Sequence, residues 1–446
     1  MVNILYFILR PAFRYNNTTF GAFIWNNSKR YLAKMQSPQS PQPFSPTQEK
    51  YCFKNQYDDY TENGAKPHIE NNTVKATSKI TAKLAAKWES VLEDLKNWTS
   101  QDYTVYTGTA GVGLLFLRKD PNDSNNLRRI RKNYLQLEQL KNRKVSFLLG
   151  DSGPLSIAAV VSHKLEDKKI FDFCIRKLMA FVKVVKNTGS EMANEYLYGR
   201  AGFLYALLYV NKNVSPPPFS QSVVRSIIEA ILYFGEKLAK HLKIDDACPL
   251  MYEWHGSKYL GAAHGVSGII YLLLQAREYL TEDELNTFIK PTIAFLSTLR
   301  FPTGNFPSSL GPGNRDKYVQ WCHGAPGFLY MYCEAFRTFG DNHYLYAAEK
   351  CADVIWFRGL VKKGYSLCHG VAGNAYCFLE MFQTTKQQKH LYRAIKFAEY
   401  CMDYTKERED QVPDTPMSLF EGISGPMYLL LDIQDPLNAK FPGFTL

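Results

Sequence analysis

The chain has 446 residues, 46% of them hydrophobic, and its formal net charge is +11. This length allows a large buried core, and because no run of 18 apolar residues occurs, we expect no helix that spans a membrane. A basic chain can bind anions, but the sequence has no zinc-finger spacing, no aromatic RNA-binding signature and no basic zipper, so we expect no nucleic-acid partner.

The first 50 residues differ in composition from the rest of the chain. Residues 1–48 contain no acidic side chain, which fits a mitochondrial targeting segment and equally a disordered extension. Residues 37–46 are rich in proline and include the P-x-x-P spacing that SH3 domains can bind. We therefore predict an extension with a proline-rich linker over residues 1–50 and one folded domain over residues 51–446.

A Gly-x-x-Gly motif followed by an apolar run recurs along the chain and is the main sign of internal repeats. Each interval between copies can hold two helices and two loops. We expect the glycines to lie in loops at one end of the fold, where they permit positive φ and close backbone approach. The second glycines of the seven copies are Gly111, Gly153, Gly202, Gly268, Gly327, Gly373 and Gly425.

The stretches between these glycines alternate between two hydrophobic patterns. Apolar runs such as residues 203–210 follow the glycines and predict helices that are buried on both sides. Stretches such as residues 392–402 have apolar residues at helical spacing and charges on the other face. Because seven alike units favour closure into a ring, we predict an all-α fold, a seven-fold α/α toroid of inner and outer helices.

Two adjacent repeats carry the same polar tripeptide just before the apolar run, Cys322-His323-Gly324 and Cys368-His369-Gly370. Thiolate and imidazole ligands suit zinc, and three protein ligands with an open fourth position are typical of a catalytic zinc site. The spacing alone leaves all four cysteine and histidine side chains as candidate ligands. The other seven cysteines are scattered, as expected for reduced core residues of a cytoplasmic protein.

Other repeats place different polar residues at the equivalent turns, namely Asp151, Arg200, His264 and Glu421. If the ring closes, these side chains point toward one mouth. A metal site with an acid–base pair beside it outlines a reaction site. We expect Arg200 and Glu421 to be structural ion-pair partners for loops.

The segments 261–265, 321–327, 367–370 and 418–422 resemble the eukaryotic LanC-like proteins, relatives of the bacterial lanthionine synthetase cyclases. The resemblance covers about Cys52 to Leu446. It implies a seven-fold α/α toroid with one zinc ion held by Cys322, Cys368 and His369. It also implies an enzyme that adds glutathione to dehydroalanine or dehydrobutyrine left in proteins or peptides after phosphate elimination.

The resemblance also implies catalytic roles for three further residues. His264 would protonate the α-carbon or hold the enolate, and Asp151 would orient His264 or a substrate amide. Arg315 resembles the cyclase arginine upstream of the first zinc cysteine, although its spacing to Cys322 is longer here than in the bacterial pattern.

The implied glutathione contacts are Lys363 and the segment that holds Pro413 and Asp414, whose charges suit the carboxylates and ammonium of the tripeptide. Gln411 and Val412 replace the usual Arg-Thr, which is expected to weaken carboxylate binding.

The favoured function is therefore a zinc-dependent glutathione transferase that acts on dehydrated phosphoprotein or peptide clients. The alternative is a signalling adaptor that binds zinc and glutathione without catalysis. A glycosidase, with Asp151 and Glu421 as its paired carboxylates, ranks last because it gives the Cys-His turns no role. We expect a cytoplasmic location, with peripheral membrane contact as in some members of the family.

Overall fold

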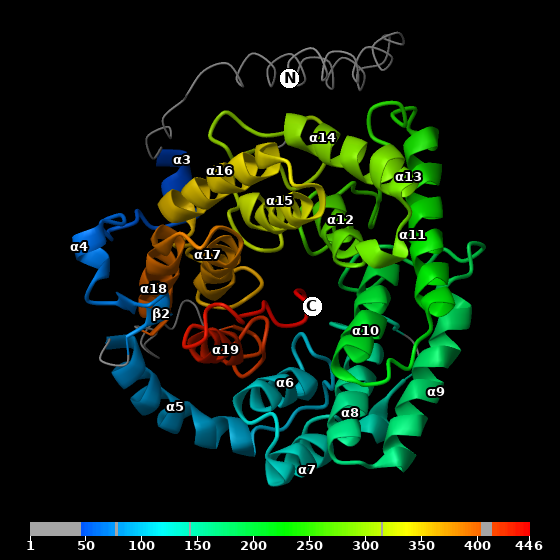
Figure 1. Ribbon diagram of the computed structural model, residues 1–446, viewed down its shortest axis with the longest axis horizontal. Coiled ribbons are helices and arrows are strands. Elements are labelled where there is room, and N and C mark those ends of the chain that lie inside the picture. The colour runs from blue at the N-terminus through cyan, green and yellow to red at the C-terminus, as the bar shows by residue number, and fades with distance from the viewer. Residues whose placement is uncertain (1–45, 76–78, 142–143, 314, 403–412) are drawn as a thin grey trace.

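The computed structural model describes residues 46–75, 79–141, 144–313, 315–402 and 413–446. Its helices form two concentric layers (Figure 1), so the prediction of an all-α toroid is confirmed. The proposed targeting segment and all of the proline-rich linker except Pro46 lie outside the described residues. Within the described ranges, no helix is long and apolar enough to cross a membrane.

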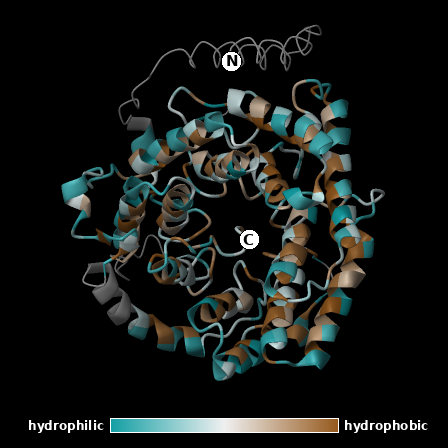
Figure 2. Cartoon of the chain, in the orientation of Figure 1, coloured by the Kyte–Doolittle hydropathy of each residue, from teal (hydrophilic) through white to brown (hydrophobic). Residues whose placement is uncertain are grey.

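The inner layer consists of the helices that follow the glycine pairs, as the repeat pattern predicts. They are buried on almost every side; in one of them, for example, each residue from Ser152 to Ser162 is buried. Figure 2 shows their hydrophobic character. In chain order they are α6 (Thr109–Lys119), α8 (Ser152–Lys164), α10 (Arg200–Asn213), α12 (Val266–Gln275), α15 (Ala325–Phe339), α17 (Val371–Thr385) and α19 (Ser424–Asp432).

The outer layer consists of amphipathic helices that turn an apolar face to the inner layer and a polar face outward (Figure 2). They are α5 (Lys79–Asn97), α7 (Ser124–Asn133), α9 (Lys168–Val185), α11 (Gln221–His241), α13 (Glu282–Glu284), α14 (Lys290–Thr298), α16 (Asn342–Arg358) and α18 (Gln388–Met402). A π turn (Leu285–Ile289) connects α13 to α14.

The ring is closed by elements from opposite ends of the chain. Helix α5 lies in the outer layer against α18 and α19, so the unit of the last glycine pair takes its outer helix from the N-terminal side. Inner helices α6 and α19 pack together, and Arg118 of α6 forms an ion pair with the buried Asp432 of α19. The hydroxyl of Tyr376 donates to the same carboxylate at 2.9 Å.

Short elements lie on the outside of the ring near α16 and α18 (Figure 1). They are α3 (Pro46–Glu49), α4 (Glu62–Ala65), and a two-stranded antiparallel sheet of β1 (Ile69–Glu70) and β2 (Thr73–Val74). Two 3-10 turns complete the described secondary structure, at Leu137–Gln139 and Arg277–Tyr279.

Most motif glycines allow another part of the backbone to approach closely, and few of them have an unusual backbone angle. A Cβ atom on Gly268 would lie 1.9 Å from the Ala262 carbonyl oxygen, and one on Gly373 would lie 2.0 Å from that of Leu367. Among the motif glycines, only Gly324 has a positive φ, at +91°. The expected close approach is therefore confirmed, whereas the expected positive φ holds at one position.

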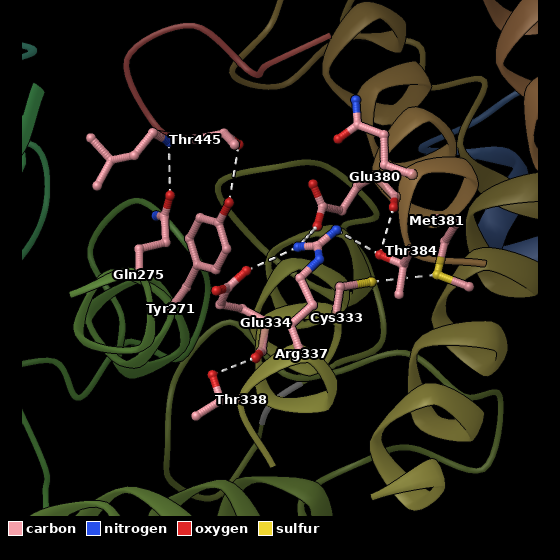
Figure 3. Close-up of polar contacts among 12 residues, drawn as sticks. Tyr271, Gln275, Cys333, Glu334, Arg337, Thr338, Glu380, Met381, Thr384 and Thr445 are labelled. Atoms are coloured by element: carbon pink, nitrogen blue, oxygen red, sulfur yellow. Dashed lines mark hydrogen bonds and ion pairs between the residues drawn. The ribbon is translucent and has the colours of Figure 1, made fainter. Parts of the chain in front are cut away.

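The C-terminal residues 441–446 run into the middle of the ring (Figure 1). Phe441 and Phe444 pack against Trp321, the residue before the first predicted zinc cysteine. The Thr445 hydroxyl lies 3.0 Å from that of Tyr271, beside an ion-paired cluster in which Arg337 contacts Glu334 and Glu380 (Figure 3). This segment therefore lies in the space that the inner helices surround.

Candidate functional site at the cysteine turns

The turns that precede the inner helices lie side by side at one end of the ring, joined by a series of backbone hydrogen bonds. The N–H of Cys322 donates to the carbonyl of Cys368 at 3.3 Å, and the N–H of Cys368 donates to that of Phe420 at 3.0 Å. The series continues from Phe420 to Tyr106 at 3.1 Å and from Tyr106 to Leu148 at 3.0 Å. Five repeat turns are therefore linked side by side.

The two predicted zinc cysteines form a buried pair. Their side chains are 7% and 4% exposed and hydrogen-bond to each other. The hydrogen bond from the Cys368 thiol lowers the pKa of Cys322, and the same contact raises the pKa of Cys368. Two residues that sequence analysis did not single out support the sulfurs: Gln320 Nε2 donates to Cys322 Sγ at 3.2 Å, and the Tyr106 hydroxyl bonds to Cys368.

The histidines beside the cysteines are partly buried and electrically neutral near pH 7. Burial, with the charge of Lys363, lowers the pKa of His369 to about 4. Burial and the neighbouring His264 lower the pKa of His323 to about 4 as well. Because a neutral imidazole is the form that binds metal ions, both rings have the protonation state of a ligand.

The types of side chain at the two cysteine turns suit a zinc ion, but their arrangement does not match a metal site as well. Two contacting thiols next to the neutral imidazole of His369 are a donor set that zinc prefers. Over the residues that the structure describes, however, no group of three or more His, Cys, Asp or Glu side chains is arranged to hold a metal ion. The buried Nδ1 of His323 has no hydrogen-bond partner in the same ranges.

An acid–histidine pair lies on the neighbouring turns. His264 Nδ1 is 2.8 Å from Glu195 Oε2, and the Glu195 side chain is 1% exposed. The backbone N–H groups of Leu197 and Tyr198 also donate to this carboxylate, at 2.8 and 2.6 Å. Sequence analysis missed Glu195, whose signal was weak: it is an acid four residues before Gly199, with Glu191 and Asn194 as polar neighbours.

Asp151 and Arg200 take part in contacts within the scaffold. The buried Asp151 accepts a hydrogen bond from the Tyr103 hydroxyl at 2.8 Å. The carboxylate that hydrogen-bonds to His264 Nδ1 belongs to Glu195. Arg200 is fully buried and donates to the backbone carbonyl of Val185, the last residue of α9, at 2.9 Å, and to that of Asn187, in the loop before its own helix, at 3.0 Å. It therefore stabilises a loop, as expected, but through carbonyl groups and not through the ion pair that we predicted.

Three of the predicted substrate-binding residues lie in the described part of the chain. The exposed Lys363 is close enough for its charge to lower the pKa of Cys322, and its Nζ is 5.6 Å from the centre of the Tyr318 ring. Asp414 is exposed and Pro413 is partly buried. Gln411 and Val412 fall outside the described residues.

Glu421 is near this group, and its environment differs from that of a surface acid. Burial and the charge of Asp414 raise the pKa of Glu421, while the charge of Lys363 lowers it. Its carboxylate accepts a hydrogen bond from Thr415 at 3.3 Å. Arg315, the third predicted catalytic residue, is exposed, and within the described ranges no hydrogen bond or ion pair joins it to the cysteine turns.

The arrangement combines a buried thiol pair, an acid–histidine pair and a lysine at one mouth of the ring. A positive charge near a sulfur favours the thiolate, which is the nucleophilic form. A histidine held by a buried carboxylate can move a proton at its other nitrogen. These groups suit thiol chemistry with proton transfer.

A closed α/α toroid with a thiol pair at its mouth defines the class of protein, and comparisons with known proteins define the family. Residues 99–446 match the family described as "Lanthionine synthetase C-like protein". The chain is 42% identical over 406 residues to "Glutathione S-transferase LANCL1" of Danio rerio, covering 89% of this chain and 100% of the relative.

Two further comparisons agree. The chain is 33% identical over 397 residues to "LanC-like protein GCL1" of Arabidopsis thaliana, covering 85% of this chain and 87% of the relative. The solved structure of nisin cyclase shares the fold, with a TM-score of 0.63 at 18% identity over 82% of this chain and 96% of that one. The chain belongs to the LanC-like family.

Proposed function

We propose that this protein is a zinc-dependent transferase that adds the thiol of glutathione to dehydroalanine or dehydrobutyrine in proteins or peptides. The observation that carries the proposal is the contacting pair Cys322–Cys368 beside the pair Glu195–His264. The relative of this chain from Danio rerio is named a glutathione S-transferase, which supports the choice of glutathione as the thiol.

Cys322, Cys368 and His369 would hold the zinc ion. When bound, zinc supplies a positive charge that stabilises a thiolate at neutral pH. Lys363 and Asp414, both exposed near the thiol pair, would bind the carboxylate and ammonium groups of glutathione. Gln320 and Tyr106 hold the two cysteine sulfurs in place from the protein side.

The acid–histidine pair Glu195–His264 would supply the proton that the α-carbon gains. Addition forms a bond between the glutathione sulfur and the β-carbon, and the electrons of the carbon–carbon double bond move to an enolate. Because His264 Nδ1 is engaged by Glu195 at 2.8 Å, its Nε2 is the nitrogen that can deliver a proton to the α-carbon. The buried carboxylate stabilises the imidazolium that gives up this proton. The glutathione S–H bond breaks and the α-carbon gains a proton, so the adduct is the sum of the two substrates and no oxidant is needed.

The experiment is an adduct assay with purified full-length protein, glutathione and a peptide that contains dehydrobutyrine. Mass spectrometry should find one glutathione added per dehydrobutyrine, and the adduct should disappear with His264→Gln, with Cys322→Ala and after chelation. A protein that binds zinc and glutathione tightly but forms no adduct above the uncatalysed rate would instead be the non-catalytic adaptor. A preparation without stoichiometric zinc would refute both functions.

A further inference from the structure

Three aromatic residues form a partly exposed wall next to His264, which we call the aromatic wall: Tyr198, Trp254 and Tyr259. The rings of Tyr198 and Trp254 are nearly parallel to the His264 ring, with interplanar angles of 6° and 17° and centroid distances of 6.1 and 6.4 Å. Tyr259 approaches the same imidazole at 5.6 Å. The histidine that would move the proton therefore lies against a surface of rings.

The backbone holds Trp254 at this surface. Trp254 and Ser257 exchange two backbone hydrogen bonds of 2.9 and 3.0 Å, and the residues between them have φ of +47° at His255 and +73° at Gly256. Two positive φ values within a two-residue hairpin are those of a type I′ turn. A histidine in the left-handed region is uncommon. The chain thus adopts an unfavourable local conformation while leaving a large aromatic side chain partly exposed.

Ring contacts place the aromatic wall at one end of the site and Lys363 at the other. Tyr259 is 6.0 Å from His323, and His323 is 5.9 Å from Tyr318. The ring of Tyr318 lies beneath Lys363 Nζ at 5.6 Å. If glutathione occupies the end with Lys363, the second substrate must approach from the side of His264, where the aromatic wall stands.

We propose that the aromatic wall is the acceptor subsite, and that its rings stack on the flat dehydroamino acid and its flanking peptide groups. This inference rests on the proposed function. A dehydroamino acid has a planar α-carbon conjugated to its amides, whereas an ordinary residue has a tetrahedral one. Aromatic faces favour flat π systems, so the wall selects the dehydrated residue over its saturated counterpart. It also sets the planar α-carbon beside the imidazole that protonates it.

Steady-state kinetics of adduct formation test the subsite, with glutathione and the dehydrobutyrine peptide varied in turn. Trp254→Leu keeps an apolar side chain but removes the ring, and we expect the KM for the peptide to rise about tenfold while that for glutathione stays unchanged. Trp254→Phe should restore most of the loss. Lys363→Ala, at the other end, should raise the KM for glutathione instead. An unchanged peptide KM in Trp254→Leu, or an equal rise in both constants, overturns the proposal.

A binding measurement separates this inference from the catalytic function. Calorimetry compares the dehydrobutyrine peptide with a twin that has 2-aminobutyrate at the same position. Wild-type protein should bind the dehydrated peptide more tightly, and Trp254→Leu should lose the difference. That result supports the subsite even if no adduct forms. If adducts form but wild type does not distinguish the twins, the proposed function stands and the subsite is refuted.

Discussion

Glu195 uses both carboxylate oxygens to tie two repeat turns together. It accepts hydrogen bonds from its own turn, at the N–H groups of Leu197 and Tyr198, and reaches across to His264 of the next repeat. The residue thus fixes both the backbone before α10 and the imidazole of His264, which lies just before α12. At this scale, the position of the His264 imidazole depends on one buried acid.

Replacing Glu195 by Gln should reduce catalysis more than folding. The amide retains an oxygen for only one of the two backbone N–H groups, so some stability is lost as well. The larger effect is that an amide cannot stabilise an imidazolium, so we expect kcat for adduct formation to fall about 100-fold. The KM for glutathione should change little. Steady-state kinetics and thermal unfolding check this, with Glu236→Gln as the control, a partly exposed acid of α11 that pairs with Lys240. A kcat equal to that of wild type would remove Glu195 from the mechanism.

At the scale of the element, each inner helix packs its first turn onto the loop that precedes it. In six of the seven copies the second glycine makes this possible because a carbonyl oxygen occupies the space of a Cβ atom, whereas at Gly327 the nearest atom is the backbone nitrogen of Ala262. In α17 the contact is between Gly373 and the carbonyl of Leu367, which directly precedes Cys368. The same contact therefore packs the helix and positions a thiol of the site.

We expect Gly373→Ala to destabilise the protein by about 1–3 kcal/mol, because the new methyl group would lie 2.0 Å from the Leu367 oxygen and must displace the turn. Urea unfolding measures the loss. Gly189→Ala is a matched control, since its added atom would meet only the side-chain oxygen of Asn187, at 3.2 Å in an exposed loop. Equal stability of Gly373→Ala and wild type would show that the turn tolerates a methyl group.

At the scale of the whole molecule, the ring depends on contacts between its two chain ends. Arg118 and Asp432 join α6 to α19, and the Asp432 side chain is only 1% exposed. Burial raises the pKa of Asp432 to about 6, against the lowering effect of Arg118. The closing contact is thus sensitive to pH near neutrality.

Arg118→Leu should destabilise the protein by about 3–5 kcal/mol at pH 8, because Asp432 is then a buried charge without its cation. A carboxyl whose pKa is higher in the folded than in the unfolded state contributes stability below its unfolded pKa and loses it as the pH rises through the folded pKa. The deficit should therefore be smaller at pH 5, where Asp432 is protonated. Urea unfolding at both pH values tests this, with the exposed Arg128→Leu as control. A deficit that does not depend on pH would contradict it.

The sequence predicts much of this architecture because the same local motif recurs. Glycine pairs mark the start of the inner helices, and two of them place Cys322 and Cys368 at equivalent positions, so their proximity could be predicted. The partner of His264 could not, because Glu195 is 69 residues away and meets it only through the packing of two repeats. The position of α5 was equally hidden, since its partner α19 lies at the far end of the chain.

The pairing of α5 with α19 also bears on how the chain is synthesised. Trp88 and Leu95 of α5 are buried in the finished protein, yet α19 is translated more than 300 residues later. Until the ribosome has passed residue 432, the part of α5 that contacts α19 stays uncovered, and this contact has the long sequence separation that slows folding. We therefore expect α5 to complete its packing only after the rest of the ring has been made.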